Sequence, residues 1–202
     1  MNRGRVLSVA AMVLYSAMAA WGQNEPYFPK GAFSNDSHHD LFSAKWYSKH
    51  LKALAEPSLL QLSKNPSLES YRFVWLRTFH HPVIVRLDIR ADGARELTSK
   101  VGSGAGGYEP GHLVENTSRP LTWEQTNRFL LSIKRSQFWE LPSYENSGMA
   151  GLDGSQWIIE GIKAGKYHLV DRWSPTKGAI HDLGLVLVES LAQMNIPKEE
   201  MY

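Results

Sequence analysis

The stretch that decides the fold runs from Val83 to Val101 and reads VIVRLDIRADGARELTSKV. Apolar and polar side chains alternate over residues 83–91, which is typical of a strand with one buried face. A second run of similar length follows a turn that contains Asp92 and Gly93. Two such runs joined by a short turn predict an antiparallel hairpin.

The register of this hairpin follows from its turn. A two-residue turn would pair Leu87 with Thr98, so that an apolar face would continue as a polar one. A three-residue turn, with Gly93 as a left-handed bulge residue, pairs Leu87 with Leu97 instead. Because a slip of one residue moves every side chain to the other face, the sequence predicts the second register.

Residues 155–173 predict a second hairpin that turns at Lys163, Ala164 and Gly165. The same bulged turn would place Glu160 directly across from His168. Directly opposed side chains of an antiparallel pair lie close enough to interact.

Apolar residues at helical spacing predict helices over residues 39–54, from Thr122 onward and over residues 179–194. Gln125 would complete a capping box with Thr122. A further strand is expected over residues 71–79. The sequence therefore predicts an α+β domain, in which an antiparallel sheet built from two bulged hairpins packs with about three helices on one of its faces.

The N-terminus predicts a secretory signal peptide over residues 1–22. Arg3 and Arg5 precede an apolar run from Val6 to Trp21, and small residues lie near its end. An uncleaved anchor is the alternative, but the run is shorter than the ~20 residues that span a bilayer. We expect a periplasmic or secreted protein with no stable membrane span after cleavage.

The mature chain is expected to have an extended lead-in over residues 23–37 and a single domain over residues 38–202. The 202 residues include 22 Lys and Arg, 20 Asp and Glu, and no Cys. Removing residues 1–22 deletes two arginines and no acid, which leaves 20 basic and 20 acidic side chains. A neutral surface indicates no nucleic-acid partner. The lack of Cys excludes disulfides, thiolate metal sites and cysteine nucleophiles.

Glu160 and His168 are the best acid–base candidates, because a carboxylate beside an imidazole raises its pKa and orients it. A solvated structural ion pair is the alternative. His80 and His81, on a turn, are candidates for metal ligands, although no metal motif surrounds them and no cofactor is indicated. The sequence gives no complete catalytic motif.

Two charges fall on apolar strand faces and require partners. Asp171 is expected among Trp157 and Trp173, and Arg77 among other aromatic residues. They could pair with each other, or Asp171 could associate with the neighbouring arginine and backbone. If the face is half covered, these residues together with Tyr108 would form a binding surface.

A glycine-rich loop over residues 102–111 contains the pattern G-x-G-x-x-G at Gly102, Gly104 and Gly107. The pattern follows a strand, but the sequence YEPG comes next instead of a helix, so dinucleotide binding is not indicated. A mobile surface loop and a loop that approaches a ligand or partner closely are the two interpretations.

The segments WYSKHL, LRTFHHP, GAGGYEPG and YHLVDRWSP resemble a group of uncharacterised secreted bacterial proteins. The resemblance covers most of the mature chain, from about residue 32 to residue 196. It implies a bacterial, exported protein and transfers no catalytic residue.

The leading hypothesis is an exported module that binds a protein, a peptide or a glycan without catalysis. The alternative is a periplasmic hydrolase that uses His168 with Glu160, assisted by a metal near the two adjacent histidines. A structural component of the envelope is the third hypothesis.

Overall fold

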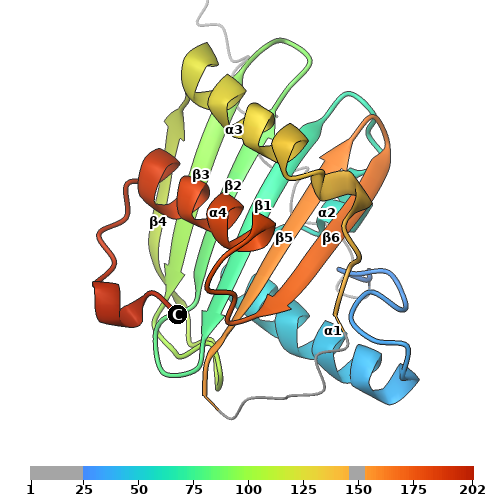
Figure 1. The fold of residues 1–202 in the computed structure, drawn as a ribbon, viewed down its shortest axis with the longest axis vertical. Helices are drawn as coiled ribbons and strands as arrows, with labels where there is room; N and C mark the ends of the chain where they lie inside the picture. Colours follow the sequence, from blue (N-terminus) through green and yellow to red (C-terminus); the bar gives the residue numbers. More distant parts are fainter. Residues whose placement is uncertain (1–24, 146–152) are drawn as a thin grey trace, which may run out of the picture.

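A computed structural model describes residues 25–145 and 153–202 of the chain. The expected signal peptide lies outside these residues. Figure 1 shows a central antiparallel sheet with helices packed against it, so the fold is α+β as predicted. Nowhere in the described part of the chain does a helix combine the length and apolar composition that a membrane crossing requires.

Within the described residues the sheet has six strands, in the spatial order β4-β3-β2-β1-β5-β6. Each strand runs antiparallel to its neighbours. The central strands β1 and β5 come from different halves of the chain, so their ends bring distant segments together. The strands are β1 (Glu69–Arg77), β2 (Val83–Ile89), β3 (Arg95–Gly102), β4 (Leu113–Pro120), β5 (Ser155–Lys163) and β6 (Lys166–Trp173).

The first hairpin has the predicted register. Leu87 lies opposite Leu97, and Val83 lies opposite Val101. Gly93 has a φ of +83°, the left-handed conformation that the bulge position requires. The alternation of apolar and polar side chains along the two strands therefore predicted their pairing correctly.

The predicted register of the second hairpin is wrong by one residue. Glu160 lies opposite Leu169, and His168 lies opposite Gly161. Ala164 and Gly165 have φ values of 50° and 79°, so they form a tight two-residue turn without a bulge. Strand β5 is buried on both faces along most of its length, and the three buried residues of β6 are consecutive and so include both of its faces. Alternation therefore could not select the register.

Strand β4 was not expected from the sequence. Its residues LVENTSRP are mostly polar and mostly exposed, because the strand lies at the edge of the sheet. Its pairing with β3 shifts between Val101 and Gly102, where the glycine-rich loop begins. A polar edge strand carries no apolar face from which to predict it.

Helices cover both faces of the sheet, so the expectation of one covered face is wrong. On one face, Leu51 and Leu54 pack against Val74, Ile84 and the facing residues of β5 and β6. On the other face, two helices pack on a core that includes Phe73, Trp75 and Trp157. The helices are α1 (Ser37–Ala53) on the first face, with α2 (Leu59–Leu62) following it, and α3 (Trp123–Arg135) and α4 (Ala179–Leu185) on the second.

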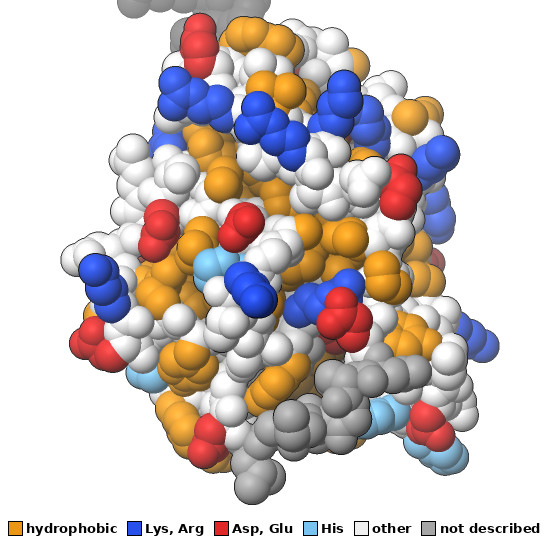
Figure 2. Space-filling view, viewed as in Figure 1, with side chains coloured by type: hydrophobic (Ala, Val, Ile, Leu, Met, Phe, Trp, Pro, Cys, Tyr) orange, Lys and Arg blue, Asp and Glu red, His pale blue; other side chains and the backbone are white. Residues whose placement is uncertain are grey.

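Figure 2 views the second face, where basic side chains lie along α3 and apolar side chains fill the space between α3 and α4. The capping box of Thr122 and Gln125 is present at the start of α3. The expected helix over residues 179–194 is α4 followed by a π-helical turn, η2 (Val186–Leu191). Two 3-10 turns complete the described part of the chain, η1 (Phe138–Glu140) and η3 (Lys198–Glu200).

Candidate functional site

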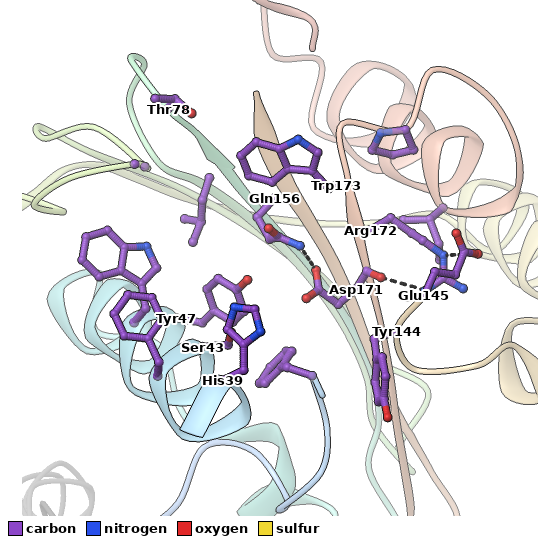
Figure 3. A pocket seen from close by; sticks show the side chains of 18 of the residues that line it. His39, Ser43, Tyr47, Thr78, Tyr144, Glu145, Gln156, Asp171, Arg172 and Trp173 are labelled. Atoms are coloured by element: carbon purple, nitrogen blue, oxygen red, sulfur yellow. Dashed lines mark hydrogen bonds and ion pairs between the residues drawn. The ribbon is translucent and has the colours of Figure 1, made fainter. Parts of the chain in front are cut away.

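A pocket of about 950 Å³ opens on the face of the sheet that carries α1 (Figure 3). It lies where the C-terminal ends of β1 and β6 meet the N-terminal end of β5. Helix α1 forms one wall, the glycine loop (residues 102–111) forms a second, and residues 175–180 form a third. The floor is made by side chains that alternate out of the three strands toward α1.

The floor carries a buried carboxyl group beside an amide. Asp171 is 8% exposed and accepts a hydrogen bond from the side-chain amide of Gln156. Burial is the main cause that raises the pKa of Asp171 to about 7, against the hydrogen bond from Gln156 and the charge of Arg172. The backbone N–H of Asp171 donates to the carbonyl of Ser143 at 2.7 Å. The carboxyl is therefore fixed at the pocket floor and is easily protonated near neutral pH.

Aromatic side chains surround this floor. Phe42 and Trp46 of α1 stack with their ring centroids 6.2 Å apart, and Phe42 is 64% exposed. Trp173 lies directly opposite Gln156 in the strand pairing and is 37% exposed. Tyr108 of the glycine loop is 57% exposed. Exposed rings around a buried polar pair are typical of a recognition site.

The glycine loop holds Tyr108 against the strand ends by close backbone approach. The N–H of Gly106 donates to the carbonyl of His80 at 3.0 Å, and that of Gly107 donates to the carbonyl of Thr78 at 3.2 Å. A Cβ on Gly106 would lie 2.5 Å from backbone atoms of β1, so only glycine fits there. The close approach of this loop is therefore to the protein's own strand β1, and its approach to a ligand or partner stays a prediction.

Ion pairs join the walls of the pocket to their neighbours. Lys49 of α1 pairs with Glu109 of the glycine loop. Arg172 pairs with Glu145 at 2.8 Å and donates to the carbonyl of Pro142 at 2.9 Å. The guanidinium group of Arg172 therefore links β6 to residues 142–145 at the rim of the pocket, and the carboxylate of Glu145 neutralises its charge.

Three of the five residues proposed for binding line the pocket together: Tyr108, Asp171 and Trp173. The other two, Trp157 and Arg77, lie on the opposite face of the sheet. Trp157 is 1% exposed in the core under α4. The possible pairing of Asp171 with Arg77 is wrong, whereas Arg172 does bond the backbone carbonyl of Asp171, at 2.7 Å.

Glu160 and His168 are not opposed, because the corrected register points them to different faces. Glu160 is fully buried and accepts hydrogen bonds from Arg72 at 2.6 and 2.8 Å and from Tyr167 at 2.9 Å. Burial raises the pKa of Glu160 against the influence of Arg72. His168 packs on the ring of Phe138 at 5.1 Å, and burial lowers its pKa. The two side chains therefore lie on opposite faces of the sheet and cannot act together as an acid–base pair.

Glu160 belongs to a buried charge network that the sequence did not reveal. Arg72 also reaches Glu56 at 3.3 Å, and Glu56 pairs with Arg86 at 3.0 Å and with Lys100 at 2.8 Å. Burial opposes ionisation of Glu56, but the three cations together hold its pKa below the ordinary value. The network joins β1, β2, β3 and β5 to the segment after α1.

His80 and His81 have protein partners. His80 Nδ1 lies 2.8 Å from the hydroxyl of Tyr202, and His81 Nδ1 lies 2.8 Å from the carbonyl oxygen of Gly104. Within residues 25–145 and 153–202, no three His, Asp or Glu side chains are grouped as a metal site would need.

The sequence reasoning missed Gln156 and the aromatic residues of α1. Phe42 and Trp46 lie off the buried stripe of α1, and this was the signal that could have identified them. Comparison of the chain with known protein families gives no match, and comparison with curated proteins gives none either. The site therefore has to be interpreted from its own chemistry.

Proposed function

We propose that this chain is an exported bacterial binding module that holds a glycan in the pocket between α1 and the ends of β5 and β6, and that it does so without catalysis. One observation carries the proposal. The carboxyl group of Asp171, a residue that is 8% exposed, lies beside an amide at the floor of a pocket walled by exposed aromatic rings.

A glycan fits both parts of this pocket. Sugar rings present flat faces of C–H groups that pack on aromatic rings, and their edges carry hydroxyls that donate and accept hydrogen bonds. Trp173, Tyr108 and Phe42 supply rings for the faces. Asp171 and Gln156 supply acceptors and a donor for the hydroxyls. A mostly apolar wall with a few fixed polar groups is the usual composition of a specific ligand site.

The buried part of the pocket favours a neutral ligand. Arg172 is matched by Glu145, and Lys49, beside the pocket, is matched by Glu109. Lys177 of the third wall is exposed to solvent. Asp171 is easily protonated, so it accepts from or donates to a hydroxyl without requiring a cation. A ligand rich in hydroxyl groups therefore loses less free energy to desolvation on entering the pocket than a strongly charged peptide does.

The absence of catalysis is supported by the placement of the acid–base candidates. Glu160 and His168 project from opposite faces of the sheet, and Glu160 is 0% exposed. A general base needs to come within hydrogen-bond reach of its partner and of the substrate. Neither residue lines the pocket.

Export is supported by the basic, apolar and small-residue order of residues 1–22. Expression of the full-length chain in a bacterium, followed by intact-mass analysis of the periplasmic and culture fractions, tests it. A mass that lacks about the first 22 residues supports export. A full-length chain retained in the cytosol contradicts it.

Glycan binding is tested by titrating the mature protein with oligomers of N-acetylglucosamine, glucose in β-1,4 linkage and glucose in α-1,4 linkage. Calorimetry should show saturable binding of at least one series. Trp173→Ala should weaken that binding by tenfold or more, because a stacking ring is lost. Trp123→Ala is the matched control, since Trp123 is also exposed (56%) but lies on α3, on the other face.

The recovered oligomer should be unchanged in length after prolonged incubation. Shortened products would contradict the non-catalytic part of the proposal. Equal losses of affinity in both tryptophan variants, or no binding by any series, would contradict the glycan site.

A further inference from the structure

The last residues of the chain fold back over the ends of β1 and β5, on the face opposite the pocket. After η2, the chain crosses this face and reaches its end beside the sheet (Figure 1). Lys198 and Glu199 are exposed, whereas Glu200 and the two residues after it are half-buried. We call residues 198–202 the tail.

Three buried donors converge on one oxygen of the tail. The main-chain oxygen of Tyr202 accepts from Trp75 Nε1 at 3.0 Å, from Trp157 Nε1 at 3.2 Å and from the Ser155 hydroxyl. Trp75, Ser155 and Trp157 are each at most 1% exposed. Trp157 Nε1 also donates to the Ser155 hydroxyl at 2.7 Å. A buried indole N–H group without an acceptor is costly, so Trp75 in particular depends on the oxygen of the tail.

A buried cation recognises the acid two residues earlier. Arg77 is 2% exposed, and its Nη1 lies 2.9 Å from Glu200 Oε2 and 3.4 Å from the carbonyl oxygen of Glu200. The guanidinium group lies 4.5 Å from the ring centroid of Trp75, which holds it in place by a cation–π contact. The phenol of Tyr202 meets His80 Nδ1 at 2.8 Å.

These contacts differ from those of an ordinary packed element. The tail is held by side chains of β1, β5 and the turn after β1, which contact a carboxylate, a main-chain oxygen and a phenol at fixed spacing. Capture of a peptide segment by an arginine and by converging N–H donors is an established mode of peptide recognition. The exposed side chain of Glu199, between the recognised groups and the solvent, takes no part in it.

We propose that Trp75, Arg77, His80, Ser155 and Trp157 form a second recognition site, for an acidic peptide segment of the form Glu-x-Tyr. The chain's own residues 200–202 occupy this site as an intramolecular ligand. A partner protein that carries the same segment would bind by displacing the tail. This site is independent of the proposed glycan pocket.

The test uses a variant in which residues 198–202 are replaced by alternating glycine and serine. The probe is a synthetic peptide of residues 196–202 with an acetylated N-terminus and an amidated C-terminus. We expect saturable binding to the variant, followed by the fluorescence of Trp75 and Trp157. The intact chain should bind the peptide at least tenfold more weakly, because its own tail is present at an effective concentration in the ~mM range.

Two further peptides separate recognition from non-specific contact. The peptide with Glu200→Gln should lose at least tenfold in affinity, because Arg77 loses its charged partner. The peptide with Glu199→Gln is the matched control and should bind as the original does. Absence of binding by the folded variant, equal binding by the intact chain, or equal losses for both peptides would overturn the proposal.

If the variant does not fold, the intact chain gives the answer by hydrogen exchange. Glu200→Gln should accelerate exchange of the backbone amides of residues 198–202, whereas Glu199→Gln should not. Equal exchange in the two variants would overturn the proposal.

Discussion

Gln156 of β5 donates a hydrogen bond from its side-chain amide to the carboxyl group of Asp171 on β6, at the floor of the pocket. The pair holds a carboxyl in a position where burial raises its pKa from 3.8 to about 7. The folded chain therefore binds this proton more tightly than the unfolded chain does. The stability that follows is present below pH ~4 and is lost as the pH rises toward about 7.

Asp171→Asn should accordingly stabilise the protein more at pH 8 than at pH 4, because the amide stays neutral. The pKa rise from 3.8 to about 7 sets an upper limit of ~4 kcal/mol for the gain at pH 8. Urea unfolding at the two pH values measures it. Asp182→Asn, at an exposed carboxyl, should show no such gain. If Asp171→Asn raised the unfolding free energy by the same amount at both pH values, the prediction would be contradicted.

Arg72→Leu should cost about 3–5 kcal/mol of unfolding free energy, because it leaves the buried Glu160 without its cation. Arg72→Leu combined with Glu160→Leu should cost less than Arg72→Leu alone, since no unpaired buried charge remains there. Chemical unfolding of the three proteins measures the difference. Arg90→Leu, at an exposed side chain, should change stability by less than ~0.5 kcal/mol.

Gly106→Ala should destabilise the protein by about 1–3 kcal/mol and weaken glycan binding, because the new Cβ meets the backbone of β1 at 2.5 Å and displaces Tyr108. Thermal unfolding and calorimetric titration measure the two effects. Gly93→Asn, in the open turn of the first hairpin, should leave binding unchanged. Normal affinity in Gly106→Ala would show that the loop does not position the pocket wall.

Ala164→Asn should stabilise the protein by about 0.5–1 kcal/mol, because Asn tolerates the left-handed conformation that Ala164 adopts before Gly165. Ala91→Asn, in the first turn, should give no gain, since Ala91 is not left-handed. Unfolding curves of both variants measure this. A loss of stability in Ala164→Asn would favour the bulged register that the sequence alone suggested.

The sequence predicted the strand register correctly only in the hairpin whose strands have one polar face. Residues 83–101 alternate, and Gly93 marks the turn, so the first hairpin could be derived. Strand β5 and the middle of β6 have buried residues on both faces, so the apolar pattern fits a register shifted by one residue almost equally well. Strand β4 was missed because an exposed edge strand has no apolar face.

The site was predicted in part, for a similar reason. Asp171 was noticed because a charge on an apolar face needs an explanation, and the pocket supplies it. Gln156 gave no signal, because a polar residue on a strand is ordinary. The partner of Arg77 could not be found, because Glu200 lies 123 residues away in the sequence, in a short 3-10 turn that no sequence pattern predicted.

The pairing of β1 with β5 at the centre of the sheet places two recognition surfaces back to back. Leu76 and Gln156 face the pocket, whereas their chain neighbours Arg77 and Ser155 face the tail. Along this short stretch, a substitution on either face of the sheet meets one of the two surfaces. Saturation mutagenesis should therefore find fewer tolerated replacements at these four positions than along the polar edge strand β4.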